Sequence, residues 1–235
     1  MSSKWRGEGG QHQGARPYQE DSWALKTLSD GSLLAVLADG MGGHAGGATA
    51  SRLVVEAMIE TLGKGGTLAD GLQAANAAVG QGAKAKRELE GMGSTVVAAI
   101  VAGDEVHWIS VGDSPFFLSN AGQLERLNAD HSMAPQIDAL LAKGMITAGE
   151  AANHPGRHTL REAVMGEPLT LIDQGSRKLG EAAQLLLCSD GVQSLREEAI
   201  AAKAALPVPQ LINQVLAAKV PHQDNVTIVK LERKS

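Results

Sequence analysis

Acidic residues at the ends of apolar runs are the side chains of this sequence best placed to do chemistry. Asp39 follows the run 33–38, Asp190 comes soon after the run 185–188, and Asp224 precedes a third apolar stretch. Short apolar runs bounded by turn residues indicate buried strands. A carboxylate at the end of a buried strand loses hydration, so it must be paired, hydrogen-bonded or bound to a cation. One Asp-Gly pair is usually an ordinary turn, but three such acids together predict a cation site.

Composition favours a single globular domain over residues 1–235. The chain is 43% apolar and 20% charged, which is typical of soluble proteins. Its net charge of −5, without a cluster of Lys and Arg, argues against nucleic acid or an anionic membrane as the main partner. The N-terminus lacks the apolar stretch of a signal peptide, and no run approaches the roughly 20 residues that span a bilayer. We therefore expect a cytoplasmic protein. A monomer is a separate expectation.

The sequence has a single cysteine, Cys188, which excludes an intramolecular disulfide. Because it lies in an apolar run, a buried and inert thiol is favoured over a nucleophile.

Hydrophobic periodicity predicts the elements that must position the acids. Apolar residues recur every three or four positions over 48–62 and 68–89, which predicts two helices separated by a Gly-rich break at 63–66. Three strands joined by short turns then predict an antiparallel meander; they are 95–101, 106–111 and 116–119.

The second half of the chain begins with a surface excursion at 131–166, which is rich in His, Pro and Gly. Short helices are expected within it at 137–143 and 147–152. Beyond it, the pattern predicts strands at 184–188 and 225–231 and helices at 197–205 and 209–218. Meandering strands with helix pairs between them indicate an α+β fold.

Seven motifs, spread over about residues 10 to 231, occur in a fixed order. They are Arg16-Pro-Tyr-Gln-Glu-Asp21, Leu37-Ala-Asp-Gly-Met-Gly-Gly-His44, Gly93-Ser-Thr95, Val111-Gly-Asp-Ser114, Asp130-His-Ser132, Cys188-Ser-Asp-Gly191 and Asp224-Asn-Val-Thr227. Together they resemble the metal-dependent, protein-phosphatase-2C-like family in its bacterial form. The segment from Gly144 to Pro155 also resembles the flap of bacterial members, which places a flap at about 131–166.

This resemblance implies both a fold and a reaction. The fold is a four-layer α/β/β/α sandwich with two central antiparallel sheets and an active site at one edge, between the sheets. The reaction is hydrolysis of phosphoserine and phosphothreonine in proteins with two Mn²⁺ or Mg²⁺ ions. Two hard cations suit this chemistry because they activate a shared water and neutralise phosphoryl charge. The implied partners are phosphorylated proteins and the bacterial kinase that modifies them.

The resemblance also implies which residues bind the ions. Asp39 would bridge both ions and the Gly40 carbonyl would bind one, whereas Asp190 and Asp224 would bind the other. Oxygen ligands of this kind favour Mg²⁺ or Mn²⁺ over softer metals. Asp113 matches the ligand of a third, weaker ion shared with Asp190, although an Asp in a Gly-Asp-Ser turn can equally cap backbone amides.

Residues around these ligands have implied supporting roles. Asp21 and Glu20 would act through metal-bound waters, and Asn225 follows the ligand Asp224. Arg16 would bind the substrate phosphate through a bidentate contact that a lysine could not reproduce; its alternative is a solvated surface arginine.

The residue that gives a proton to the leaving alkoxide is matched less directly by the motifs. Animal-type members place a histidine directly after Asp-Gly, where this sequence has Met41, and the histidine comes three residues later as His44. His44 would donate through water near neutral pH, or it is simply a residue at a helix start. His131 is interpreted as structural, bonding a flap carbonyl.

Some positions depart from the family pattern. Gln19 stands where Asn is usual, and Pro115 replaces the arginine that commonly follows Gly-Asp-Ser. The segment 221–223, Pro-His-Gln, replaces a Gly-rich turn. The change to Pro115 removes a possible charge contact near Asp113.

Three hypotheses for the activity follow. The first is an active phosphatase opposing a bacterial Ser/Thr kinase. The second is a pseudophosphatase, a regulatory binding module without turnover, which the presence of Asp39, Asp190 and Asp224 disfavours. The third is a phosphatase dedicated to one target, such as an anti-sigma-antagonist or a secretion-system regulator.

Overall fold

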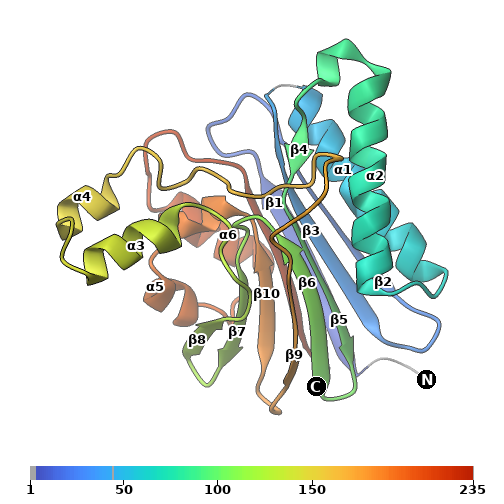
Figure 1. Cartoon of the computed structure of the whole chain (residues 1–235). Coiled ribbons are helices and arrows are strands. Elements are labelled where there is room, and N and C mark those ends of the chain that lie inside the picture. The colour runs from blue at the N-terminus through green and yellow to red at the C-terminus, as the bar shows by residue number, and fades with distance from the viewer. Residues whose placement is uncertain (1–3, 44, 235) are drawn as a thin grey trace.

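The computed structural model describes residues 4–43 and 45–234. Two antiparallel sheets form its centre (Figure 1). In spatial order, the first sheet, called here the β11 sheet, consists of β1 (Trp5–His12), β11 (Val226–Arg233), β10 (Gln184–Cys188), β7 (Phe116–Asn120) and β8 (Gln123–Arg126). The second, the β3 sheet, consists of β2 (Asp21–Thr27), β3 (Leu33–Met41), β5 (Val96–Ala102), β6 (Glu105–Val111) and β9 (Asp173–Lys178), with β4 (Gly93–Ser94) paired to the end of β3.

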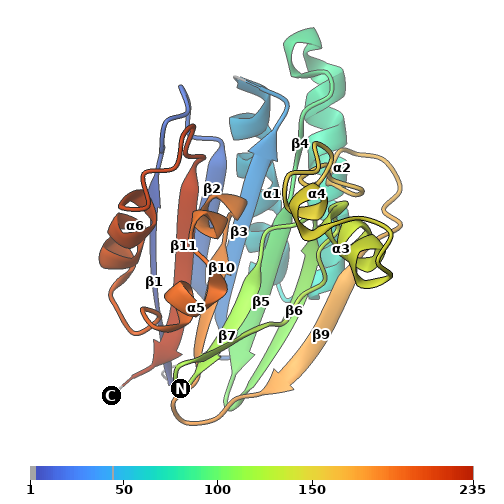
Figure 2. The same ribbon diagram turned by 90° about the vertical axis from the view of Figure 1, so that its left-hand side faces the viewer.

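Helices cover the outer face of each sheet (Figure 1). The β3 sheet is covered by α1 (Ala45–Gly63) and α2 (Leu68–Ala85), and the β11 sheet by α5 (Glu197–Ala201) and α6 (Val208–Leu216). Two short 3₁₀ helices are η1 (Arg87–Leu89) and η2 (Asp190–Ser194). In the segment 131–166, where the flap is expected, α3 (Ala134–Ala142) and α4 (Ala148–Ala152) lie to one side of the two sheets in Figure 1 and face the viewer in Figure 2. In the described part of the chain, no helix combines the length and apolar character needed to cross a bilayer.

Strand β3 shows how the layers are held together. Leu34 and Val36 pack against the α1–α2 layer, whereas Leu33, Ala35 and Leu37 pack between the two sheets. Apolar residues on both faces explain why the run is continuous rather than alternating. A third apolar layer lies between the β11 sheet and the helices α5 and α6. These layers confirm the predicted α/β/β/α sandwich.

The predicted three-strand meander is wrong in its last strand. β5 and β6 pair as expected, but β7 belongs to the other sheet, where it pairs with β10. The chain changes sheets at Gly112, whose φ of +102° is accessible mainly to glycine. A Cβ there would lie 2.6 Å from the Thr95 side chain, so the turn is tightly enclosed. A short turn predicts that two successive strands lie side by side, but it does not decide whether the second strand joins the same sheet.

Other differences concern elements with a weak apolar signal. The sequence pattern does not predict β1, β2, β8 or β9, and the helix expected at 197–205 ends at Ala201. β9 is mostly exposed at the edge of its sheet, and β1 contains three glycines. Edge strands of this kind gain their conformation from backbone pairing with a neighbour, which a local pattern does not report.

Candidate active site

The end of β3 fixes the first acidic residue of the site. In the β2–β3 register, Asp39 lies opposite Asp21. The Asp39 amide donates to Thr95 Oγ1 at 3.0 Å, and its carbonyl accepts from the Thr95 amide at 2.8 Å and from Ser94 Oγ at 2.9 Å. The predicted Gly-Ser-Thr motif therefore anchors the backbone of Asp39.

Three further acids reach the same place from distant parts of the chain. Asp113 lies in the turn between the two sheets, Asp190 begins η2 after β10, and Asp224 precedes β11. All three line a pocket of about 250 Å³ together with Asp39. The pocket is also lined by other residues singled out from the sequence, namely Arg16, Glu20, Gly40 and Asn225. Asp21 is buried beneath it, beside Asp39 in the β2–β3 ladder.

Crowding of these acids raises the pKa values of their carboxyl groups. Burial, reinforced by the charges of Asp21 and Asp190, raises the pKa of Asp39 well above its ordinary value. Burial raises the pKa of Asp21 to about 6, although Thr227 donates to its Oδ2 at 2.6 Å. Burial and the charge of Asp190 raise the pKa of Asp113 to about 7. Without a cation, the charged forms of these groups are unfavourable.

The donor set fits hard divalent cations. Asp21 Oδ1 is buried and makes no hydrogen bond with any described residue, so its charge is only partly compensated. Among the described residues, no group of three or more His, Cys, Asp or Glu side chains is already arranged to hold a metal ion. Carboxylate and carbonyl oxygens are the ligands that Mg²⁺ and Mn²⁺ prefer.

The N-terminal loop is tied to the Asp-Asn motif. Arg16 Nη2 donates to Asp224 Oδ2 at 2.6 Å, so the guanidinium lies at the rim of the pocket. The Asn225 amide bridges the loop: its Oδ1 accepts from the Glu20 amide at 2.8 Å, and its Nδ2 donates to the carbonyl of Tyr18 at 3.0 Å. Asn225 thus positions both Arg16 and Glu20 beside the acids.

Gly40 occupies a position that no larger residue fits. A Cβ at Gly40 would lie 2.1 Å from the carbonyl oxygen of Gly47 and 2.5 Å from that of Glu20. We expect Gly40→Ala to lower the free energy of unfolding by about 2–3 kcal/mol, because backbone atoms on both sides must move. Gly149→Ala is the matched control, because nothing lies within 4 Å of a Cβ in that helix. Urea denaturation measures both changes, and equal midpoints for the two variants would contradict the close approach.

The histidines considered for the site lie in different places. His44 lies outside the described residues. His131 is buried, and its Nδ1 accepts from the amide of Gly112 at 3.2 Å, so it supports the sheet-crossing turn. His158, which the sequence analysis missed, lines the acidic pocket from the flap, together with Leu160. No local motif marks His158, since only the flap's path brings it there.

Arg126 supplies the cationic contact that Pro115 appeared to remove. Its Nη2 donates to the Asp113 carbonyl at 2.8 Å, and its Nη1 pairs with Asp130 Oδ2 at 3.1 Å. The guanidinium comes from β8, a strand that the sequence pattern did not predict. The Asp113 turn is therefore held from the β11 sheet.

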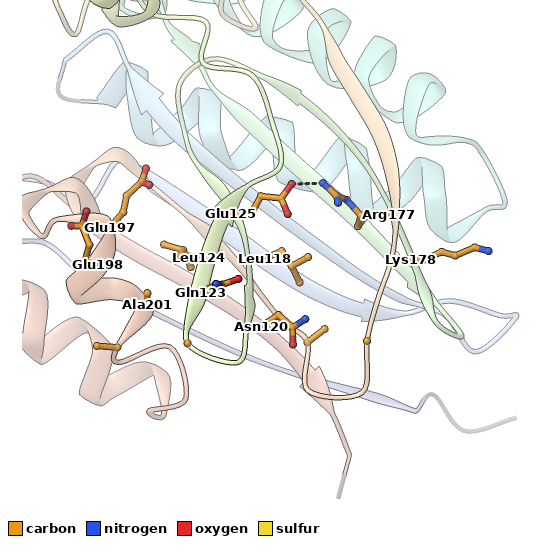
Figure 3. Close-up of a pocket in the computed structure, with 14 residues that line it drawn as sticks. Leu118, Asn120, Gln123, Leu124, Glu125, Arg177, Lys178, Glu197, Glu198 and Ala201 are labelled. Atoms are coloured by element: carbon orange, nitrogen blue, oxygen red, sulfur yellow. Dashed lines mark hydrogen bonds and ion pairs between the residues drawn. The ribbon is translucent and has the colours of Figure 1, made fainter.

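A larger cavity, of about 670 Å³, lies elsewhere, between β7, β8, β9 and α5. Figure 3 shows Arg177 paired with Glu125 on one side of it and Glu197 and Glu198 on the other. None of the residues predicted to bind metal or phosphate lines this cavity. The smaller acidic pocket is the better candidate because its chemistry, rather than its volume, is distinctive.

Known proteins resemble this chain over most of its length. A family model described as Protein phosphatase 2C matches residues 7–223. Serine/threonine protein phosphatase PstP of Mycobacterium tuberculosis is 34% identical over 214 residues, which cover 85% of this chain and 40% of PstP. Serine/threonine phosphatase stp of Listeria monocytogenes is 30% identical over 233 residues, which cover 93% of this chain and 91% of that protein.

Solved structures lead to the same family. The crystal structure of the PstP catalytic domain in complex with two manganese ions is 30% identical, with a TM-score of 0.80; the match covers 98% of this chain and 99% of that one. This chain spans about two fifths of the length of full PstP, the first of its curated relatives. The model match extends over most of the chain and includes the motifs carrying Asp39, Asp113 and Asp190. The chain belongs to the protein phosphatase 2C family.

Proposed function

We propose that this protein is a metal-dependent phosphatase that hydrolyses phosphoserine and phosphothreonine in proteins. The observation that carries the proposal is the meeting of four strand-end acids and Arg16 around one pocket, from segments up to about 200 residues apart in sequence. Relatives named as Ser/Thr phosphatases, and a relative's structure with two manganese ions, support the proposal. Nothing in these comparisons favours the pseudophosphatase alternative.

The proposed metal ligands are the residues that ring the pocket. Asp39 and the Gly40 carbonyl would hold one ion, with Asp39 also reaching the second beside Asp190 and Asp224. Asp113 is the proposed ligand of a third ion. Glu20 and Asp21 would not bind the ions directly but would hold waters bound to them. When bound, the ions would supply an activated water and neutralise charge on the phosphoryl group.

The chain's own residues bind and orient the substrate. Arg16 presents N–H groups at the pocket rim, and its ion pair with Asp224 fixes the direction of the guanidinium. Asn225 holds the loop that carries Arg16, so the phosphate contact is preorganised. His44 remains the proposed proton donor to the leaving alkoxide, acting through water.

The biological setting follows the sequence expectation. We propose a monomeric, cytoplasmic catalytic domain that opposes a bacterial Ser/Thr kinase by acting on its phosphorylated substrates. Composition and the bacterial relatives support this assignment.

Removal of divalent metal tests the proposal directly. We expect hydrolysis of p-nitrophenyl phosphate and of a phosphothreonine peptide to disappear in excess EDTA and to return with Mn²⁺, because the clustered acids need a cation before they can accept a phosphate. The measurement is phosphate release by metal-stripped protein, with and without Mn²⁺. Turnover that persists in EDTA would contradict the metal assignment. Mn²⁺ binding without release from either compound would favour the binding-module hypothesis.

A further inference from the structure

A second cavity adjoins the acidic pocket and leads away from it. It has a volume of about 330 Å³ and shares Asp113 and His158 with the acidic pocket. One side is formed by the flap around α3, and the other by the segment from η2 to α5. We call this cavity the flap groove. A polypeptide whose phosphorylated residue occupies the acidic pocket would therefore continue past this shared boundary into the flap groove.

Ion pairs fix the flap side of the groove. Arg126 joins β8 to the 128–132 loop through Asp130, and their side chains are only 21% and 20% exposed. Arg157 binds Asp138 of α3 with both terminal nitrogens, at 2.7 and 3.0 Å. Such forked contacts hold their partners in one geometry. These two guanidiniums are therefore occupied in shaping the groove.

Arg196 is the remaining arginine of the groove and is differently placed. It precedes α5 on the opposite wall, is exposed, and forms no ion pair with another described residue. Arginine is well suited to bind a carboxylate or phosphate of a partner because its planar donors form two parallel hydrogen bonds. An arginine without an ion pair to another described residue, in a cavity that adjoins the acidic pocket, therefore has the chemistry to recognise an anion near the scissile phosphate.

We propose that the flap groove binds the substrate polypeptide beside its phosphorylated residue, and that Arg196 pairs with an acidic group of that polypeptide. This proposal rests on the proposed phosphatase function and adds a substrate class: phosphoproteins with an anionic residue near the phosphorylation site. Because the flap groove adjoins the acidic pocket, the anionic residue is expected close to the phosphoresidue in sequence. A carboxylate and a second phosphate share this chemistry.

Glu197 provides an internal test because its charge is opposite. It follows Arg196, is exposed, and also lines the groove. Loss of this carboxylate removes repulsion toward an anionic substrate, so Glu197→Gln is expected to strengthen the preference that Arg196→Gln weakens. Arg177→Gln is the matched control, because Arg177 lines the cavity of Figure 3 but not the flap groove, and it is paired with Glu125.

The experiment compares three phosphothreonine peptides that differ only within four residues of the phosphate: one carries Asp residues, one Asn residues, and one a second phosphothreonine. Two readouts are used with Mn²⁺ present. The first is kcat/KM relative to that for p-nitrophenyl phosphate, and the second is affinity for non-hydrolysable phosphonate versions, measured by fluorescence anisotropy. We expect the Asp peptide to be favoured over the Asn peptide by about three- to fivefold, as for an exposed ion pair.

The expected preference falls to about onefold in Arg196→Gln, rises in Glu197→Gln and is unchanged in Arg177→Gln. It also weakens at high salt, because the pair is exposed. Equal use of the Asp and Asn peptides by the parent protein, or a preference that survives Arg196→Gln, would overturn the proposal. A stronger preference for the second phosphate identifies phosphate as the natural anion, and equal preference identifies any anion. Binding preference without turnover would preserve the groove and refute the phosphatase function.

Discussion

Asp39→Asn is expected to lower phosphatase activity about a thousandfold while leaving the fold intact. The amide has nearly the same volume as the carboxylate, so the β2–β3 and β3–β5 ladders around it are preserved. It lacks the charge that the proposed bridging position needs, and a metal ion contributes several kcal/mol to this kind of chemistry, each 1.4 kcal/mol being tenfold in rate. The measurement is kcat/KM for a phosphothreonine peptide at saturating Mn²⁺.

The same substitution should make the metal-free protein more stable. The pKa of Asp39 is raised by burial and by neighbouring carboxylates, so the folded state resists its ionised form. Asparagine carries no charge, so this repulsion is absent in the variant. We expect the melting temperature of Asp39→Asn in EDTA at pH 8 to exceed that of the parent by about 2–4 °C, which corresponds to about 1 kcal/mol. Lost activity with raised stability distinguishes a functional role from misfolding.

The matched control is Asp104→Asn. Asp104 is exposed, pairs with Arg233 at 2.9 Å and lies in the turn between β5 and β6. It should leave both activity and melting temperature near parental values, because exposed ion pairs contribute little. Near-normal kinetics in Asp39→Asn would show that the bridging position is assigned to the wrong residue.

The second large effect is a reversal of pH dependence by Mn²⁺. Asp21 and Asp113 have pKa values raised from 3.8 to about 6 and about 7. A pKa raised in the folded state gives stability that is present below pH 4 and lost as pH rises through 6 to 7. In EDTA, we expect a loss on the order of 2–3 kcal/mol between pH 5 and pH 8, or about 5–10 °C in melting temperature.

Mn²⁺ should give the opposite trend, because it binds the deprotonated carboxylates and its affinity increases with pH. Differential scanning fluorimetry over pH 5–8, with EDTA or Mn²⁺, measures both profiles. Asp113→Asn is the informative variant: it should flatten the EDTA profile between pH 5 and 7, where the folded state still holds the proton that the unfolded state has lost. A parent protein whose stability in EDTA is constant over this range would contradict the proposed crowding of acids.

Local sequence determined the elements whose signal is local. The continuous apolar run of β3 and the strand 184–188 are predicted because burial on both faces leaves an almost uninterrupted apolar stretch. Helices α1 and α2 follow from their apolar period, and a capping box between Thr67 and Asp70 marks the start of α2. The order of the motifs identified the family and the acids at Asp39, Asp190 and Asp224, since these lie at strand ends recognisable from sequence.

Only the tertiary structure decided which elements became neighbours. It assigned β7 to the β11 sheet, paired Arg16 with Asp224 across 208 residues, and brought His158 of the flap to the acidic pocket. It also supplied Arg126 from a strand with little apolar signal. A local sequence pattern shows which face of a helix or strand is buried, because hydrophobic periodicity is a property of one segment. Contacts between distant segments depend on the path of the whole chain, which no single segment encodes.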